Sequence, residues 1–417
     1  MHTLLIADGR SPITKNWLRM LAGLNWHVSL VSTFLCDPPE GAQLLEVLPV
    51  GFSTLAGGQV HSPLPHAQKS IKPEQTGWKR TLLNRSRPLL RAVRARLGPL
   101  TLGKYQRRLV EICADIRPDL AHALRIPFEG MLAATLPGHV PLLVSIWGND
   151  LTLHARSSAQ MASLTRLVLK RADALLADAA RDVRLAADWG LRADVPRLVA
   201  PGNGGLDFSQ IHATLKNRQA HLPFDLPPGR PIVVNPRGFR PGSVHQDTFF
   251  RSIPLVLRNI PDAFFVCTAM RGQPQAEGWV ERLNLQPHVL LLPYLTQEEL
   301  WQLFEKSNVY LSLSSHDGIP NTFLEALACG CFPVAGDIES LREWIINGQN
   351  GLLVNPRDEE ESAKAITRAL QDDNLTEQAK RHNQELVQER ADMQTVREQF
   401  SVFITQFMEK RDLPTDQ

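Results

Sequence analysis

The stretch from Val309 to Asp337 decides the fold, and it reads VYLSLSSHDGIPNTFLEALACGCFPVAGD. Its first part, Val309 to Ser315, is β-branched, aromatic and apolar with small serines, which predicts a short buried strand. Gly318 and Pro320 then mark a turn, and Phe332 to Ala335 reads as the next strand. A strand, a tight loop and a second strand joined through a helix are typical of a parallel α/β sheet.

Between the turn and the second strand the sequence predicts a short helix. Asn321 is expected to cap a helix from Thr322 to Cys329, and Gly330 is expected to end it. The first N–H groups of a helix lack intrahelical partners, and the helix dipole favours an anion there. We therefore expect a diphosphate to bind the amides near Asn321 and Thr322.

Two acids flank this helix start. Glu325 lies inside the helix and is placed to accept hydrogen bonds from sugar hydroxyls, while Asp317 in the loop would hold a second group of hydroxyls. For either acid alone, a solvated carboxylate that interacts favourably with the helix dipole is the better explanation. The combination of both acids with a phosphate-binding helix start favours a ligand site.

These residues carry a resemblance to a known family. Asp317 and Glu325 have seven residues between them, and the motif continues through Glu325-Ala326-Leu327-Ala328-Cys329-Gly330, Pro333-Val334-Ala335, Glu343, Gly348, Gly351-Leu352-Leu353-Val354 and Pro356. This block resembles the donor site of retaining glycosyltransferases of family four, which have the GT-B fold. That family usually has a glutamate where this chain has Asp317, so the first acid is one methylene shorter here.

The resemblance implies an α/β protein with two Rossmann-like, doubly wound domains facing a cleft. Strands alternate with helices in both halves of the sequence, which predicts a doubly wound parallel sheet in each. A Pro-rich linker between about Gly202 and Arg230 is expected to join the halves. We expect an acceptor-binding domain at residues 1–205 and a donor-binding domain at 206–392. The resemblance also implies that a C-terminal helix at 393–417 crosses back onto the first domain.

Composition places the chain among soluble proteins of a reducing compartment. Hydrophobic residues make up 43%, and the five cysteines have no zinc-type spacing, so we expect them to be buried and free. The first residues read as a strand, and no apolar run is long enough to span a bilayer. We therefore expect a cytoplasmic protein, peripheral on the cytoplasmic face of the inner membrane.

The membrane expectation comes from charge. Lys69 to Arg108 holds 12 Lys and Arg residues and one acid, Glu74, although the whole chain has a net charge of only +2. Residues 78–97 show an amphipathic helical pattern within this segment, and residues 54–77 read as a mobile loop. A solvated basic helix packed on the first domain is the alternative to an anionic membrane surface. The resemblance favours the membrane, since many members of the family glycosylate lipid-linked acceptors at the cytoplasmic leaflet. Few aromatic residues accompany the charge, so we expect no nucleic-acid partner.

An arginine follows the first predicted strand of the second half. The family places an Arg on the donor diphosphate at this point, and Arg237 matches it; a guanidinium pairs with two phosphate oxygens and keeps its charge. The family's Lys, a few residues later, has no counterpart here. Arg240 or His245 is the candidate replacement, and the resemblance leaves that choice open.

The remaining donor contacts also follow the resemblance. Met270, Tyr294 and Leu295 follow strands at positions where the family reads the nucleotide base, with loop packing as the alternative explanation. The loop residues Gly318 and Ile319 complete the predicted donor site. Gly9, after the first strand, matches a position where the family has glycines near the donor phosphates.

On the acceptor side the family has a His-Gly-x-Asp motif, and this chain has Trp147-Gly148-Asn149-Asp150. The resemblance implies that Asp150 contacts the acceptor and the reacting carbon, together with His154 shortly after it. Asn203-Gly204-Gly205-Leu206-Asp207 resembles the family's turn between the domains, with one extra glycine, and we expect it to be structural.

The resemblance implies a retaining transferase that moves a sugar from a nucleoside diphosphate to a hydroxyl of a sugar or lipid-linked acceptor. Bacterial polysaccharide, lipopolysaccharide or glycolipid synthesis is the expected setting, with a UDP-sugar ahead of a GDP-sugar and no other cofactor. Arg237, Asp317 and Asp150 would carry the reaction.

No Asp-x-Asp pair occurs, so we expect the phosphates to be stabilised without a metal. A nucleotide-sugar epimerase of the same fold and a noncatalytic sugar-binding protein remain alternatives. An NAD-dependent oxidoreductase is disfavoured because no G-x-G-x-x-G motif opens a helix after a strand.

Overall fold

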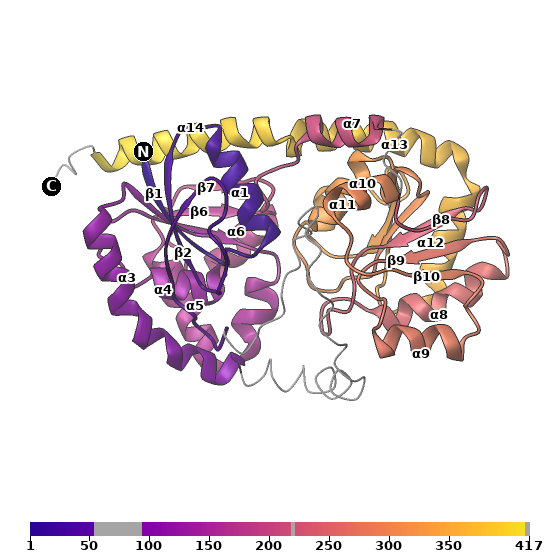
Figure 1. Cartoon of the computed structure of the whole chain (residues 1–417), viewed down its shortest axis with the longest axis horizontal. Helices are drawn as coiled ribbons and strands as arrows, with labels where there is room; N and C mark the ends of the chain where they lie inside the picture. The colour runs from indigo at the N-terminus through magenta and orange to yellow at the C-terminus, as the bar shows by residue number, and fades with distance from the viewer. Residues whose placement is uncertain (54–93, 218–221, 413–417) are drawn as a thin grey trace. The chain divides into compact units, whose positions relative to one another are not determined.

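The computed structural model describes residues 1–53, 94–217 and 222–412 (Figure 1). They form two compact units, of which the first contains the described residues before Leu206 and those from Ala391 onward. The second unit contains the described residues from Leu206 to Arg390. Each unit is built on a parallel sheet, which confirms the predicted α/β class with two Rossmann-like halves.

The first unit has a seven-stranded sheet in the order β3-β2-β1-β4-β5-β6-β7. Its strands are β1 (His2–Ala7), β2 (His27–Ser32), β3 (Gln43–Val47), β4 (Leu120–Ala123), β5 (Leu142–Ile146), β6 (Ala174–Ala177) and β7 (Arg197–Val199). Its helices are α1 (Pro12–Ala22), η1 (Gly98–Thr101), α3 (Leu102–Ile116), η2 (Ile126–Gly130), α4 (Met131–Ala133), η3 (Asp150–His154), η4 (Ala155–Ser157), α5 (Ala159–Arg171), α6 (Ala180–Asp188) and α14 (Met393–Asp412). Buried apolar clusters on both faces explain why the strands read as continuous hydrophobic runs.

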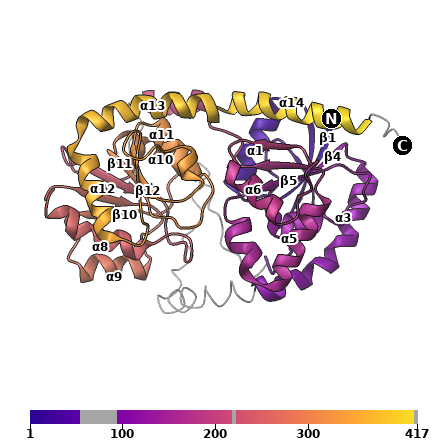
Figure 2. The same ribbon diagram turned by 180° about the vertical axis from the view of Figure 1, so that it is seen from behind.

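The C-terminal helix α14 packs on the first unit, as predicted. It lies beside α1 (Figures 1 and 2). The rings of Trp17 on α1 and Phe400 on α14 meet edge to face, with their centroids 5.3 Å apart. The Arg397 Nε also donates to the backbone oxygen of Met20 at 2.9 Å. Asp392 caps the helix start, so the chain leaves the second unit at a defined residue.

The extra glycine near residue 205 has a packing role. Gly205 has a φ of +93°, and a Cβ there would lie 2.7 Å from the Cα of Met393. The preceding turn is held by α1, because the Trp17 indole donates to the backbone oxygen of Gly202 at 2.8 Å. A glycine is therefore required where the turn closes against the C-terminal helix.

The second unit has a six-stranded sheet in the order β10-β9-β8-β11-β12-β13. Its strands are β8 (Ile232–Asn235), β9 (Phe264–Cys267), β10 (Val289–Leu291), β11 (Val309–Ser312), β12 (Phe332–Gly336) and β13 (Leu352–Val354). Its helices are α7 (Phe208–Lys216), α8 (Gln246–Leu257), α9 (Pro274–Arg282), α10 (Gln297–Glu305), α11 (Asn321–Ala328), η5 (Leu341–Glu343), α12 (Glu359–Gln371) and α13 (Asp373–Ala391). The central strands β8 and β11 are neighbours, so the loops that follow them meet at one edge of the sheet.

Several local predictions are corrected. The segment expected to be a linker contains helix α7, whose cap Asp207 accepts from the backbone N–H of Gln210 at 3.0 Å. Strand β13 also falls where no strand was predicted, since its three residues give too short a pattern. The mobile loop and most of the basic helix expected at 54–97 lie outside the described residues. No helix in the described part combines the length and the apolar character needed to cross a bilayer.

Candidate active site

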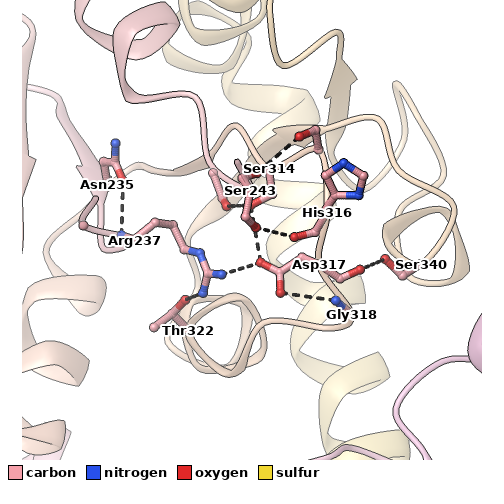
Figure 3. A network of polar contacts seen from close by, with 12 residues as sticks. Asn235, Arg237, Ser243, Ser314, His316, Asp317, Gly318, Thr322 and Ser340 are labelled. Atoms are coloured by element: carbon pink, nitrogen blue, oxygen red, sulfur yellow. Dashed lines mark hydrogen bonds and ion pairs between the residues drawn. The ribbon is translucent and has the colours of Figure 1, made fainter. Parts of the chain in front are cut away.

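Arg237 and Asp317 form the centre of the site (Figure 3). The Arg237 Nη2 donates to Asp317 Oδ2, and Nη1 lies 3.5 Å from the Thr322 hydroxyl. The Arg237 side chain is only 4% exposed and that of Asp317 is 17% exposed. Within the described residues the Arg237 Nε is buried without a hydrogen-bond partner. Arg237 is therefore brought together with two predicted residues, Asp317 and Thr322, that lie 80 and 85 residues later in the chain.

Backbone contacts fix the loop that carries Asp317. The Asp317 Oδ1 accepts from the Gly318 N–H at 3.2 Å, and its backbone oxygen accepts from the Ser340 hydroxyl at 3.0 Å. The Ser243 hydroxyl donates to the backbone oxygen of His316, which ties the loop after β8 to the loop after β11. Ile319, the next predicted contact, is 6% exposed. The carboxylate is therefore held in place before any ligand binds.

Helix α11 begins one residue earlier than predicted, which corrects the role of Asn321. Asn321 is the first helical residue, and the N-cap is Pro320, which supplies no side-chain hydrogen bond. Proline fixes its own φ near the value observed, −64°, but has no side chain that could accept from the first amides. The helix start therefore lacks the side-chain cap that would compete with a phosphate.

The end of α11 confirms the predicted stop. Gly330 has a φ of +93°, and its N–H donates to the backbone oxygen of Leu327 at 3.0 Å. The Cys331 N–H reaches back to the oxygen of Ala326 at 2.9 Å, which completes a Schellman motif. Helix α11 is thus fixed at its carboxyl end and open at its amino end.

Glu325 is buried, with 5% exposure, one turn inside α11. Burial raises the pKa of its carboxyl to about 7, and the hydrogen bond from Gln297 acts in the opposite direction. The Gln297 Nε2 donates to Glu325 Oε1 at 2.9 Å. A buried carboxyl with one strong donor retains capacity to accept hydroxyl donors from a ligand.

The loop predicted to contact the base runs directly into helix α10, whose first residue, Gln297, bonds to Glu325. Tyr294 is 79% exposed and precedes the capping box formed by Thr296 and Glu299, which starts α10. Leu295 lies beside it and is half-buried. The loop and Glu325 are linked because Gln297, the first residue of α10, bonds to the carboxyl. The predicted base-contacting loop and the predicted ribose ligand therefore lie in one connected structure.

Met270 lies in the hydrophobic core of the second unit, where its side chain is fully buried. Its contact with the donor stays a prediction. The cause of the burial is the turn before it, where Ala269 has a φ of +60° and Met270 donates its N–H to the Leu292 oxygen. A residue directly after a strand end can point inward as readily as outward, and sequence does not distinguish the two.

Arg240 and His245 were the candidates for the missing lysine. The charge of Arg237 lowers the pKa of the Arg240 guanidinium to about 10, and desolvation acts in the same direction, so the two cations lie close together. His245 instead contacts the Ser315 hydroxyl at 3.0 Å, and burial together with Arg357 lowers its pKa. Electrostatic proximity therefore favours Arg240 as the second cation beside Arg237.

Asp150 is fully buried, and its contact with the acceptor stays a prediction. Its side chain is 0% exposed and accepts from Arg125 Nη2 at 2.6 Å and from the backbone N–H groups of Ile126 and Trp147 at 3.1 and 3.2 Å. The carboxylate therefore positions Arg125, whose side chain is 24% exposed, and does not itself face the solvent. The Arg125 guanidinium and the Ile126 N–H lie 25 and 24 residues before Asp150 in the chain, so no local pattern predicts these contacts.

Gly9 and His154 also lie in the first unit. The Gly9 N–H donates to the Ser32 hydroxyl at 3.1 Å, and a Cβ at Gly9 would lie 2.5 Å from the Cys36 sulfur. Close packing explains this glycine without a ligand, and its donor contact stays a prediction. His154 is half-buried at the end of η3, and its acceptor contact also stays a prediction.

Gln297 and the serines that hold the Asp317 loop were not among the residues predicted from the sequence. The capping-box spacing of Thr296 and Glu299 was a usable signal for Gln297, since it places that residue at the first position of a helix. Ser243 and Ser340 gave no signal, because both act through contacts with distant backbone atoms.

Comparison with known proteins agrees with this arrangement. Residues 9–202 match the glycosyl transferase 4-like domain, and residues 228–386 match glycosyl transferases group 1. O-antigen chain mannosyltransferase B of Escherichia coli is 31% identical over 114 residues, which cover 27% of this chain and 29% of that protein. This chain therefore matches less than a third of the curated relative's length.

Solved structures share the fold at low identity. Sucrose-phosphate synthase from Thermosynechococcus elongatus has a TM-score of 0.67 and 18% identity, with 98% of this chain and 100% of that chain covered. HepE from Anabaena, solved in complex with UDP, has a TM-score of 0.65 and 17% identity, with 97% and 100% covered. The two matched domains occur here in the order of the two sheets, and the chain belongs to the family-four glycosyltransferases with the GT-B fold.

Proposed function

We propose that the chain transfers a sugar from a nucleoside diphosphate, preferably UDP, to an acceptor hydroxyl with retention of the anomeric configuration. The observation that carries this proposal is the Arg237–Asp317–Thr322 network at the uncapped start of α11. A cation, a helix start without a side-chain cap and a hydroxyl converge where a diphosphate would leave. The complexes of HepE with UDP and with UDP-glucose support a nucleotide-sugar donor by analogy.

Each residue has a distinct role in the proposed reaction. Arg237 and the amides at the start of α11 stabilise the charge that develops on the diphosphate as the bond between the sugar carbon and the phosphate oxygen breaks. The acceptor oxygen bonds to that carbon from the same face, and its proton passes to the departing diphosphate. Glu325 holds the ribose hydroxyls, and Asp317 holds the hydroxyls of the donor sugar. No metal takes part in this scheme.

The reaction's setting is proposed as the synthesis of bacterial polysaccharide, lipopolysaccharide or glycolipid. The O-antigen mannosyltransferase and a lipopolysaccharide outer core galactosyltransferase, WaaB, are among the proteins this chain resembles. A panel of nucleotide sugars, incubated with and without extracts containing lipid-linked and free glycans, tests the proposal. Release of nucleotide only with an acceptor is expected. Release of an epimerised sugar without an acceptor would instead assign an epimerase, and binding without turnover would refute catalysis.

We also propose that the protein works at an anionic membrane surface. Only residues 94–108 of the basic segment are described, and they present two exposed leucines, Leu97 at 46% and Leu100 at 67%. Lys104 and Arg107 are exposed nearby on α3. Apolar side chains beside basic ones can insert shallowly while the charges attract anionic lipid, by about 1 kcal/mol for each basic residue at the surface.

Liposome flotation tests the membrane proposal. The protein should float with phosphatidylglycerol vesicles at low salt and dissociate at high salt. Replacing both Leu97 and Leu100 by Ser, or both Lys104 and Arg107 by Glu, should reduce flotation. Lys364→Glu, an exposed position on α12, is the control for added negative charge. A wild type that stays in solution with these vesicles at low salt would disprove membrane binding.

A further inference from the structure

Arginines gather at the carboxyl edge of the first unit's sheet. Arg10 follows β1, Arg125 follows β4, and Arg94 lies in the helical residues before η1. Strands β1 and β4 are neighbours, and the chain winds outward from them in opposite directions. This is the switch point at which open parallel sheets place their ligands.

Aromatic rings bring two of these arginines together. The Arg10 Cζ lies 3.9 Å from the centroid of the Phe34 ring, and the Arg94 Cζ lies 5.4 Å from the same centroid. Arg94 also lies 4.7 Å from the Phe128 ring, while Arg125 lies 4.8 Å from the ring of Trp147. Like charges near one ring repel each other, so the arrangement is most favourable when an anion joins it.

The arginines differ in their partners. Arg10 pairs with Asp8 at 3.1 Å, and Arg125 pairs with Asp150 at 2.6 Å. Among the described residues Arg94 has no ion pair and no hydrogen bond, and its Nε is buried without a partner, as is the Nε of Arg125. The cluster therefore contains hydrogen-bond donors and one cation that the described part of the protein does not satisfy.

A third carboxyl lies among these arginines without neutralising Arg94 by direct contact. Glu129 is 4% exposed and accepts from the Thr33 hydroxyl at 2.8 Å. Its burial raises the pKa of the carboxyl to about 7, against the effect of the Arg125 charge. A partly protonated Glu129 leaves more of the positive charge available to a ligand.

Phe128, whose ring lies beside Arg94, has an unfavourable backbone conformation. Phe128 has φ 68° and ψ −55°, the rare γ-turn region. Glycines make room for its ring, because a Cβ at Gly51 or at Gly98 would lie 2.7 or 3.0 Å from it. Strained residues of this kind persist where the surroundings fix them, and they gather at ligand sites.

We propose that Arg94, Arg125 and Arg10 bind an oxyanion carried by the acceptor, such as a phosphate, a diphosphate or a sugar carboxylate. The planar fork of a guanidinium matches two oxygens of such a group. The site then selects acceptors in which an anionic group lies near the attacking hydroxyl. This assignment rests on the proposed glycosyl transfer, although the anion site itself does not.

Equilibrium dialysis with radiolabelled pyrophosphate at low ionic strength tests the site on the full chain. Arg237→Ala serves as the background, because it removes the expected donor phosphate contact. In that background one pyrophosphate should still bind, Arg94→Gln should weaken it at least fivefold, and Arg94→Lys should restore part of the affinity. Arg96→Gln, a neighbouring exposed arginine, should leave binding unchanged. Loss of all binding in Arg237→Ala alone, or equal effects of the Arg94 and Arg96 changes, would overturn the proposal.

Competition identifies the source of the anion. Glucose 1-phosphate, farnesyl diphosphate and glucuronate represent a phosphorylated sugar, a lipid-linked diphosphate and an acidic sugar. Displacement of pyrophosphate by any of them, lost in Arg94→Gln, supports the site and names its ligand class. The dialysis measurement does not depend on turnover. A nucleotide-sugar panel without activity would therefore refute the proposed transferase activity but not the proposed anion site. Efficient transfer to neutral acceptors with no effect of Arg94→Gln would refute the acceptor assignment alone.

Discussion

Replacing Glu325 by Gln should stabilise the protein at alkaline pH and weaken nucleotide binding at the same time. The pKa of the buried carboxyl is raised from 4.5 to about 7. A raised carboxyl pKa means that the folded state holds its proton over a range in which the unfolded chain releases it. The stability that this proton provides is present below about pH 4.5 and is lost as the pH rises to about 7.

The magnitude follows from the shift. One pKa unit corresponds to about 1.4 kcal/mol, so the wild type should lose about 3 kcal/mol from this group between pH 4.5 and 8. Glutamine has nearly the same shape and does not titrate, and its oxygen can still accept from Gln297. The two proteins should therefore be similar in stability at pH 4.5, and the variant should be more stable by about 3 kcal/mol at pH 8.

Urea unfolding at pH 4.5 and pH 8, followed by tryptophan fluorescence, measures this difference. Glu305→Gln, an exposed change on α10, controls for the altered net charge. If the difference in the free energy of unfolding between variant and wild type is the same at both pH values, the raised pKa assigned to the buried Glu325 carboxyl is refuted.

Nucleotide binding provides the second readout. The ionised Glu325 accepts ribose hydroxyls more strongly than a neutral amide does, since a hydrogen bond to a charged group contributes about 1.5–3 kcal/mol. The affinity ratio of wild type to variant for UDP should therefore rise between pH 6 and 8 and reach about tenfold or more. Titration of the UDP phosphate affects both proteins equally, so calorimetry of the pair isolates Glu325. An affinity ratio that does not change with pH would refute the assignment of Glu325 to the ribose hydroxyls.

Three further perturbations test the remaining assignments. Arg237→Ala should lower kcat by about 100- to 1000-fold with a smaller change in KM, because the diphosphate gains charge in the transition state; a change in KM alone would assign Arg237 to ground-state binding. Chelation of divalent ions should leave turnover intact, and rescue of a chelated, inactive enzyme by Mn²⁺ or Mg²⁺ would contradict the proposed metal-free chemistry. Gly205→Ala should cost about 1–3 kcal/mol in thermal or urea unfolding because its φ is +93° and its Cβ would meet the Met393 backbone. Gly103→Ala on α3, where the added Cβ would have no atom within 4 Å, should instead stabilise the protein by about 0.5–1 kcal/mol.

The strands could be predicted because each is short, apolar and bounded by turn residues. β6, β8 and β9 have the bounds expected from sequence, Ala174–Ala177, Ile232–Asn235 and Phe264–Cys267. Helix α7 could not be predicted in the same way, because its nine residues lie between a glycine-rich turn and a proline-rich stretch. Local composition averages over such a segment and obscures a short amphipathic pattern.

The residues of the candidate site could be predicted only where they belong to a motif with a fixed spacing along the sequence. Arg237 and Asp317 are 80 residues apart, and nothing local in the sequence indicates that they touch. The family resemblance placed both near the diphosphate, but it did not indicate their ion pair. It also could not show that Asp150 would be enclosed by backbone donors or that Met270 would enter the core. Side-chain direction after a strand end depends on long-range contacts.

In both units, arginines at strand ends are oriented by neighbouring carboxylates. Arg237 is held by Asp317, Arg125 by Asp150 and Arg10 by Asp8. A carboxylate that engages part of a guanidinium fixes its plane and leaves other N–H groups to a ligand, which lowers the conformational entropy lost on binding. Asp317 is one methylene shorter than the usual glutamate, and it stays on its loop, where the Gly318 N–H holds it. In the proposed function, this shorter acid positions Arg237 for the diphosphate, and its exposed part is left to accept from the hydroxyls of the donor sugar.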